Sequence, residues 1–317
     1  MTTFKGIRGT AIKSTSSDPS NPETGQIWYN STTAQLKGYQ TGGTWASSGN
    51  MATARAQLAG AGTQTAGLGF GGYTPTLSNA TEEYDGTSWT AGGNLGTARR
   101  LLAGCGTQTV ALGFGGYATG NSNATEEYDG TSWTAGGNLG TAKRNLSGCG
   151  TQTVAAAFGG FDTAVTAATE EYNGTAWSAG GNLITARRNL GGAGTQTVAA
   201  AFGGYTGTEN TALTEEYDGT TWTASGNMNV ARRYLAGCGL QTAALAIGGT
   251  TTPAVANTEE YNGTSWSVEG NLGTARQTLA GAGTQTAGLA FGGTTGSVSA
   301  LTEEYTGGLQ TRVINIS

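Results

Sequence analysis

The sequence contains no histidine, which removes the commonest general base and the commonest metal ligand. Only 11% of the residues are charged, and the net charge is −5. No basic stripe is present, so we expect no nucleic-acid partner. No apolar run reaches membrane-spanning length, so we expect no membrane insertion. No P-loop, nucleophile elbow or zinc-ligand spacing is found either. We therefore predict no catalytic residue, no metal site and no cofactor.

Cysteine is also scarce, and its placement excludes a disulfide framework. Cys105, Cys149 and Cys238 occupy one repeated position that other copies fill with alanine. A residue that alternates with alanine fills a small buried space, so we expect neither disulfides nor metal binding. The first residues lack the apolar core of a signal peptide. These features indicate synthesis in a reducing cytoplasm.

What the sequence does contain is glycine, 57 residues of it, arranged in a tandem repeat. The step between repeats is 44 residues, with one step of 45. A repeat of this length with four short β-prone runs indicates a propeller or another stacked array. The landmarks are glycine pairs, beginning at Gly71, Gly115, Gly159, Gly203, Gly248 and Gly292, and tryptophans, at Trp45, Trp89, Trp133, Trp177, Trp222 and Trp266.

One repeat unit, which begins at residue 102, shows the order of the four runs. The first run is small and glycine-rich, and the second is apolar and ends at Gly115 and Gly116. The third contains Glu127 and Tyr128, and the fourth contains Trp133. An Asp-Gly or Asn-Gly pair between the last two runs suits a two-residue hairpin turn. We therefore expect an all-β fold of four-stranded antiparallel blades that bury each other's faces.

This order of a glycine pair, a tyrosine and a tryptophan resembles the kelch repeat. The resemblance covers about five-sixths of the chain and implies a kelch-type β-propeller. A basic residue in the segment that links successive units also fits the family; these residues are Arg55, Arg99, Lys143, Arg187, Arg232 and Arg276.

The number of blades and the domain limits follow from the length. Dividing 317 residues by the step gives about seven, so we favour seven blades. In this interpretation residues 1–24 form an attachment arm, residues 25–50 form a degenerate first blade, and residues 51–317 form the propeller. The tail after Gly308 then supplies a fourth strand. The alternative has six blades, with the strand around Trp45 completing the last one.

Two repeated polar positions suggest chemistry, but their repetition favours structure. Pairs such as Glu126 and Glu127 precede the tyrosine in six copies, whereas a catalytic pair is needed once. Neighbours in a strand point to opposite faces. We expect one glutamate to meet a linker arginine such as Arg99 or Arg187, and the other to face solvent. The second position holds Gln64, Gln108, Gln152, Gln196, Gln241 and Gln285, which either bond within an inner strand or line an axial channel.

The loops between the second and third runs differ from unit to unit, although the framework is nearly identical. A rigid scaffold with variable loops on one face is typical of binding proteins. Neutral drift in unconstrained loops explains the same variation, and the aromatic residues would then cap their blades. The candidate binding-face loops begin at Tyr73, Tyr117, Phe161, Tyr205, Thr250 and Thr294.

Residues 17–39, with the run GQIWYN, resemble a module of tail-fibre-like proteins of marine bacteriophages. The resemblance implies a structural or adhesion protein of the virion. Our hypothesis is a non-enzymatic virion protein of a tail fibre or appendage, made in the host cytoplasm and present in several copies. It would bind other virion proteins through residues 1–24, and a host surface glycan or protein through its loops. The alternatives are a capsid decoration protein, a carbohydrate-active depolymerase and an intracellular kelch interaction module.

Overall fold

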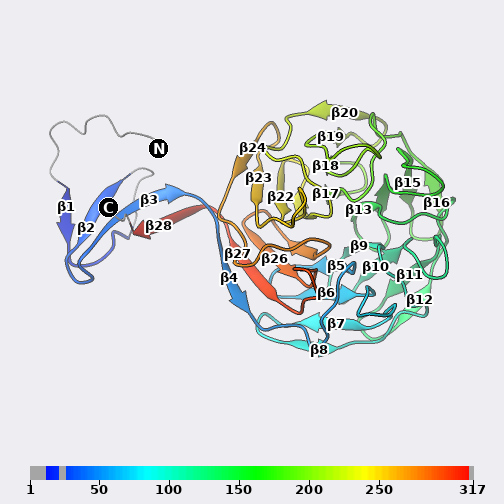
Figure 1. Ribbon diagram of the computed structural model, residues 1–317, viewed down its shortest axis with the longest axis horizontal. Coiled ribbons are helices and arrows are strands. Elements are labelled where there is room, and N and C mark those ends of the chain that lie inside the picture. Colours follow the sequence, from blue (N-terminus) through cyan, green and yellow to red (C-terminus); the bar gives the residue numbers. More distant parts are fainter. Residues whose placement is uncertain (1–11, 21–25, 314–317) are drawn as a thin grey trace. The chain divides into compact units, whose positions relative to one another are not determined.

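The computed structural model describes residues 12–20 and 26–313, and all regular structure within them is β-strand (Figure 1). The chain divides into two compact units. Residues 44–306 form one, which we call the ring unit. The two chain ends, residues 1–43 and 307–317, contribute to the other, which we call the terminal unit. The predicted all-β class is confirmed.

The ring unit consists of six four-stranded sheets arranged around a common centre (Figure 1). Neighbouring strands in every one of these sheets are antiparallel, as the hairpin turns predicted. From the innermost strand outward, the first two sheets are β5 (Ala59–Gly62), β6 (Gly67–Phe70), β7 (Thr81–Tyr84), β8 (Trp89–Ala91), and β9 (Ala103–Gly106), β10 (Ala111–Phe114), β11 (Thr125–Tyr128), β12 (Trp133–Ala135). The third and fourth sheets are β13 (Ser147–Gly150), β14 (Ala155–Phe158), β15 (Thr169–Tyr172), β16 (Trp177–Ala179), and β17 (Gly191–Gly194), β18 (Ala199–Phe202), β19 (Thr214–Tyr217), β20 (Trp222–Ser225). The fifth and sixth sheets are β21 (Ala236–Leu240), β22 (Ala243–Ile247), β23 (Thr258–Tyr261), β24 (Trp266–Val268), and β25 (Ala280–Gly283), β26 (Ala287–Phe291), β27 (Thr302–Thr306), β4 (Thr44–Ser48).

Strand β4 closes the ring, because it comes from the start of the chain and pairs with β27 near its end. Trp45 lies opposite Tyr305 in this pair, as Trp89 lies opposite Tyr84 in the first sheet. The innermost strands contact one another in a circuit that returns from β25 to β5. Sheets that surround an axis and pack face to face in this way define a β-propeller.

The terminal unit contains the seventh four-stranded sheet, in the order β1 (Lys13–Thr15), β2 (Ile27–Asn30), β3 (Gln35–Thr41), β28 (Leu309–Val313). The pair β1 and β2 is parallel, and the other pairs are antiparallel. Asp18 accepts hydrogen bonds from Trp28 Nε1 and Asn30 Nδ2, at 3.1 and 2.7 Å, and it also pairs with Lys37. These contacts, led by that of Lys37, lower the pKa of Asp18 to about 2.

The number of blades and the domain limits were both predicted from the sequence. The structure has seven four-stranded sheets in total, which agrees with the favoured prediction of seven blades. Six of these sheets form the ring, and the strand that contains Trp45 completes the last of them, as in the six-blade alternative. The predicted degenerate blade, residues 25–50, is divided: β2 and β3 join the terminal unit, and β4 joins the ring. The tail does supply a fourth strand, β28, but to the terminal sheet. Of the predicted arm, residues 1–24, only 12–20 lie within the described residues.

Neighbouring blades are held together by aromatic side chains between their faces. Trp133 contacts Tyr128 of its own blade at 4.9 Å, and Phe70 of the preceding blade at 4.7 Å, between ring centroids. Its Nε1 donates to Thr81 Oγ1 of that preceding blade at 2.9 Å. The cysteines fill buried positions in these interfaces and are free thiols, as predicted, and burial raises the pKa of Cys105 to about 12.

The paired glutamates have two separate structural roles. Glu126 Oε1 lies 2.8 Å from Nη2 of the fully buried Arg99, so the predicted meeting with a linker arginine is confirmed. The expectation that the second carboxylate faces solvent is wrong: Glu83 accepts a hydrogen bond from Tyr128 Oη of the next blade at 2.5 Å. Linker pairs recur in all six blades: Arg55–Glu82, Arg99–Glu126, Lys143–Glu170, Arg187–Glu215, Arg232–Glu259 and Arg276–Glu303.

The repeated glutamines also join blades. Gln108 Nε2 donates to the carbonyl oxygens of Gly67 and Tyr84, at 3.2 and 2.7 Å, and both acceptors belong to the preceding blade. The bonds therefore run between blades, and not within one inner strand. The other glutamines make the equivalent pair of bonds. This supports the hydrogen-bonding interpretation over the axial channel.

Candidate binding face

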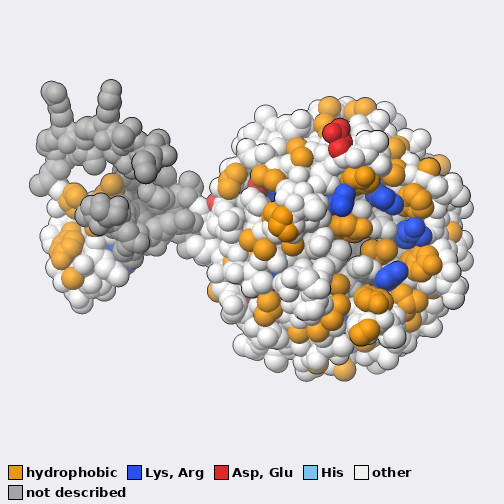
Figure 2. Space-filling view, viewed as in Figure 1, with side chains coloured by type: hydrophobic (Ala, Val, Ile, Leu, Met, Phe, Trp, Pro, Cys, Tyr) orange, Lys and Arg blue, Asp and Glu red, His pale blue; other side chains and the backbone are white. Residues whose placement is uncertain are grey.

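The six variable loops lie on one side of the ring, beside the segments that link successive blades. The first residue of each loop forms a β-bridge with a linker residue: Tyr73 with Ala56, Tyr117 with Arg100, Phe161 with Arg144, Tyr205 with Arg188, Thr250 with Arg233, and Thr294 with Gln277. We call this side of the ring, formed by these loops and linkers, the loop face. The candidate residues of the sequence analysis are thus gathered in one place, and Figure 2 views this face.

The glycine pair allows the loop and the linker to approach. Gly115 and Gly116 both have positive φ, 65° and 102°, which glycine adopts at little cost. A Cβ on Gly115 would lie only 2.9 Å from the carbonyl oxygen of Lys143 in the linker. The N–H of Gly116 donates to that same oxygen at 2.9 Å. The repeated Gly-Gly motif therefore fixes the linker backbone against the blade.

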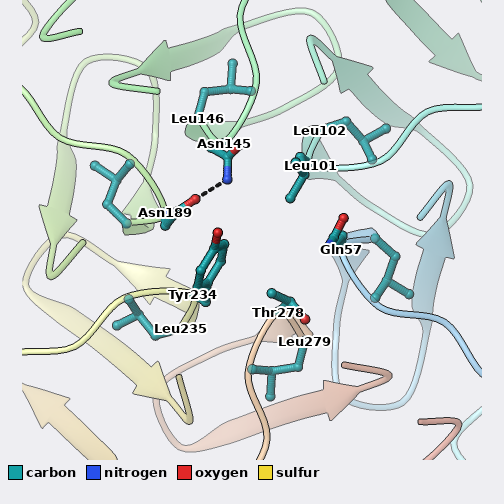
Figure 3. Close-up of a pocket in the computed structure, with 12 residues that line it drawn as sticks. Gln57, Leu101, Leu102, Asn145, Leu146, Asn189, Tyr234, Leu235, Thr278 and Leu279 are labelled. Atoms are coloured by element: carbon teal, nitrogen blue, oxygen red, sulfur yellow. Dashed lines mark hydrogen bonds between the residues drawn. The ribbon is translucent and has the colours of Figure 1, made fainter. Parts of the chain in front are cut away.

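At the centre of the loop face, one residue from each linker takes part in a closed circle of backbone hydrogen bonds. Each N–H donates to the carbonyl oxygen of the equivalent residue in the preceding blade, at 2.8 or 2.9 Å. We call these residues the axial ring (Figure 3): Gln57, Leu101, Asn145, Asn189, Tyr234 and Thr278.

Every residue of the axial ring has a left-handed backbone, with φ between 55° and 59°. This conformation costs an L-residue about 1–2 kcal/mol, although asparagine tolerates it better than most. The β-branched Thr278 and the bulky Leu101 and Tyr234 are poor choices for such a backbone. The backbone is the same in six blades, whereas the side chain is not. The backbone conformation therefore does not account for the choice of side chain at these six positions.

The residue before each axial-ring position is arginine in four blades, and these arginines alternate with aromatic rings. Each guanidinium lies over two rings, with distances to the ring centroids from 4.7 to 5.8 Å. Contacts of this kind stabilise by about 0.5–1 kcal/mol at exposed sites. We call the four arginines the arginine arc: Arg100, Arg144, Arg188 and Arg233. The rings between them belong to Tyr117, Phe161 and Tyr205, and Tyr73 contacts Arg100 at one end of the arc.

Two arginines of the arc are oriented by asparagine, and two are not. Arg144 Nη1 donates to Asn121 Oδ1 at 2.8 Å, and Arg233 Nη1 donates to Asn210 Oδ1 at 3.3 Å. In the other two blades the equivalent loop positions hold Leu77 and Val165. Within the described structure, the buried Nε atoms of Arg100 and Arg188 have no hydrogen-bond partner.

Four residues of the axial ring and three arginines of the arc line a cavity of about 370 Å³. Its walls are formed by Gln57, Arg100, Leu101, Tyr117, Arg144, Asn145, Arg188 and Tyr234. Figure 3 shows the axial-ring side chains around the centre, with the amide of Asn145 bonded to that of Asn189. Figure 2 shows basic side chains grouped around the same centre, with hydrophobic side chains between them. The cavity is thus polar and positively charged.

The variable loops were predicted from the sequence, whereas the axial ring and the arginine arc were not. The aromatic residues that begin the loops were predicted either to bind a partner or to cap their blades, and in the structure all four contact arginines of the arc. Thr250 and Thr294 bridge their linkers without an aromatic ring, so the arc extends over part of the circle. A signal for the axial ring was present: two residues after the buried basic residue, the otherwise similar linkers carry five different side-chain types in six copies.

The described residues offer little else as a site of chemistry. They contain no cluster of three or more histidine, cysteine, aspartate or glutamate side chains able to hold a metal ion. No helix among them is long and apolar enough to cross a membrane. The chain is a β-propeller with a cationic, aromatic-lined cavity at its centre. No protein-family model matches the sequence, and a search of curated proteins finds no similar chain.

Proposed function

We propose that this chain is a non-enzymatic binding protein that recognises its partner with the loop face. The axial ring supports this proposal best. Its side chains differ at positions where the backbone is constant and disfavours most of them. Residues held in sparsely populated conformations cluster at functional sites, because a gain in function offsets their cost. Selection for stability alone would favour asparagine or glycine at all six positions.

We further propose that the propeller is of the kelch type and belongs to a bacteriophage virion, as part of a tail fibre or appendage. The motif residues that resemble kelch have structural roles here: Gly115 and Gly116 position the linker, and Tyr128 and Trp133 fill the interface between blades. The resemblance of residues 17–39 to phage tail-fibre-like proteins supports the virion assignment. The ring would meet a host surface glycan or protein, and residues 1–24 would attach several copies to other virion proteins.

Binding of fluorescently labelled full-length chain to host cells tests the role of the loop face. Leu101→Asp places a negative charge in the axial ring, where aspartate tolerates the left-handed backbone. Val110→Asp is the matched control, because Val110 is 46% exposed in the turn at the opposite end of strand β9. We expect the first variant to lose cell binding and the second to retain it. Loss in the control alone, or in neither, contradicts the proposal.

Deletion of residues 1–24 tests the virion assignment. We expect the shortened chain to fold and to be missing from purified particles, because its attachment segment has been removed. Normal incorporation into particles would show that another part of the chain makes the attachment. Labelling of intact particles then distinguishes a tail position from a position on the capsid.

A further inference from the structure

We propose that the arginine arc binds an acidic polysaccharide, with the guanidinium groups pairing with its carboxylate or sulfate groups. This inference rests on the proposed binding role of the loop face, and it names the chemical class of the ligand. Four properties of the site support it: the contacts of its aromatic rings, its charge, the composition of its walls, and the placement of its arginines on successive blades.

Three of the loop rings, those of Tyr117, Phe161 and Tyr205, each lie between two guanidinium groups, and Tyr73 contacts one. Arg100 and Arg144 lie 5.5 and 5.1 Å from the centroid of Tyr117, and Arg144 and Arg188 lie 4.9 and 5.0 Å from that of Phe161. Proteins that bind single-stranded nucleic acid need free aromatic faces on which the bases stack. Rings held between guanidinium groups do not offer such faces. Their role here is to position the arginines, so recognition falls to the charged groups.

The charge of the site favours an anion. Four arginines gather on one face of a chain whose net charge is −5. The surrounding loops carry two acidic residues, the half-buried Asp162 and the exposed Glu209, and neither forms an ion pair with the arc in the described structure. A guanidinium presents a planar set of donors that matches carboxylate or sulfate oxygens in two parallel hydrogen bonds.

The walls of the cavity favour a sugar over a peptide. Leu101 is the one aliphatic side chain among the eight residues that line it. Peptide and protein partners rely on apolar and aromatic anchors that fill desolvated pockets. The other leucines at the centre of the ring line a smaller adjoining pocket, of about 90 Å³ against about 370 Å³ for the polar cavity. Gln57, Asn145 and Tyr234 instead offer hydrogen bonds to hydroxyl groups, and Gln57 Oε1 is buried without a hydrogen-bond partner in the described structure. The volume, about 370 Å³, is within the range of small-ligand pockets.

The arrangement also favours a polymer over a single small anion. The arc supplies one arginine per blade over four consecutive blades, and Arg233 lies beyond the residues that line the cavity. A chain with a charge on each repeating sugar would contact successive arginines. Such multiple pairing strengthens binding without any new type of contact. We therefore expect affinity to rise with the length of the oligosaccharide.

Calorimetric titration of the full-length chain tests this inference. The probes are oligogalacturonates of increasing length, their neutral methyl esters, a sulfated glycan, poly-glutamate and a single-stranded oligonucleotide. We expect oligogalacturonate or the sulfated glycan to bind, with affinity that falls as salt rises because the contacts are ionic. The methyl ester should not bind. Which of the two acidic glycans binds more tightly distinguishes carboxylate from sulfate.

Two single variants, Arg100→Gln and Arg188→Gln, supply the second arm. Each should weaken binding about tenfold, because it removes a charge-assisted hydrogen-bonding group from the site. Neither arginine is held by an asparagine, so both variants should fold, and thermal unfolding checks this. Lys13→Gln is the matched control, because it removes the same charge from an exposed position in the terminal unit. The control should bind as the parent chain does.

The outcomes separate this inference from the proposed function. If Leu101→Asp abolishes cell binding but no acidic glycan binds the parent chain, the ligand class is wrong and the binding role stands. Preference for poly-glutamate or for the oligonucleotide overturns the inference in favour of a peptide or a nucleic acid. Equal binding by the arginine variants and the parent chain shows that the arc is not the site.

Discussion

The residues of the axial ring hold a left-handed backbone at a cost in stability, which on the proposed function serves recognition. A left-handed φ is common for glycine and tolerated by asparagine, and Asn145 and Asn189 fit it. Leucine, tyrosine and threonine do not. Stabilising substitutions that harm activity are expected at functional sites of this kind. The axial ring therefore allows stability and binding to be tested at the same position.

Leu101→Gly should make the fold more stable and binding weaker. Removal of the Cβ relieves the left-handed strain, and after the entropic cost of glycine the free energy of unfolding should rise by about 1 kcal/mol. Urea denaturation measures this change. Leu101→Ala is the control, because it shortens the side chain and keeps the Cβ, so it should gain no stability. A loss of stability in the glycine variant would mean that the Leu101 side chain packs favourably.

The buried cation of each linker is a second residue-scale feature, and one blade departs from the others. Arg99 Nη1 donates to the carbonyl oxygens of Gly115 and Ala124, at 2.9 and 2.7 Å, besides pairing with Glu126. Lys143 occupies the same position in the next blade and pairs with Glu170 at 3.0 Å. A single ammonium group cannot reproduce the planar set of donors of a guanidinium.

Lys143→Arg should therefore raise the free energy of unfolding by about 1 kcal/mol, the net contribution of a hydrogen bond or two. Arg99→Lys should lower it by a similar amount, and it serves as the reverse control. Thermal and urea unfolding measure both changes. Equal stability of the parent chain and the two variants would show that the carbonyl contacts contribute nothing.

At the scale of the strand, the sequence predicted most of the structure correctly. The repeat predicted the four strands of each blade, because every copy carries the same turn glycines and the same buried aromatic residues. The terminal unit was harder, since its strands occur once and leave no periodic signal. The pairing of β3 with β28 joins residues from opposite ends of the chain, and no local pattern reports such a contact. The arginine arc was missed for the same reason, because its rings and cations come from different blades.

Strand β4 is an element whose importance a mutation can measure. Trp45 contacts Tyr305 at 5.0 Å between ring centroids, and its Nε1 donates to Thr258 Oγ1 at 2.8 Å. Trp133 makes the equivalent ring contact with Tyr128 and the equivalent hydrogen bond to Thr81. Trp45→Ala and Trp133→Ala should therefore each lower the free energy of unfolding by about 3–5 kcal/mol. Chemical denaturation gives both values. A much smaller loss for Trp45→Ala would show that the closing strand adds little to the ring.

At the scale of the whole ring, tyrosine hydroxyls link every blade to its neighbour, and they make stability depend on pH. Burial, together with a hydrogen bond to a glutamate, raises the pKa of five of these tyrosines to about 12; they are Tyr84, Tyr128, Tyr172, Tyr217 and Tyr261. In the unfolded chain tyrosine ionises near pH 10. The raised pKa therefore favours the folded ring fully below about pH 10, and this contribution is lost as the pH rises through 12.

We expect cooperative alkaline unfolding in this pH range. Tryptophan fluorescence reports the ring, and tyrosinate absorbance reports the ionisation, which should accompany unfolding for the five buried tyrosines. Tyr128→Phe removes one of the titrating groups, so its stability should fall less steeply with pH. Ionisation of all tyrosines near pH 10 in a ring that stays folded would contradict the assigned pKa values.

The pairing of β4 with β27 brings the two ends of the ring unit together. Thr44 lies directly opposite Thr306, so the chain enters and leaves the ring at a single point of its circumference. A domain whose ends lie together can be inserted into a surface turn of an unrelated carrier without stretching it. The ring unit therefore has the geometry of a domain that a gene rearrangement can insert into another protein without disturbing the loop face.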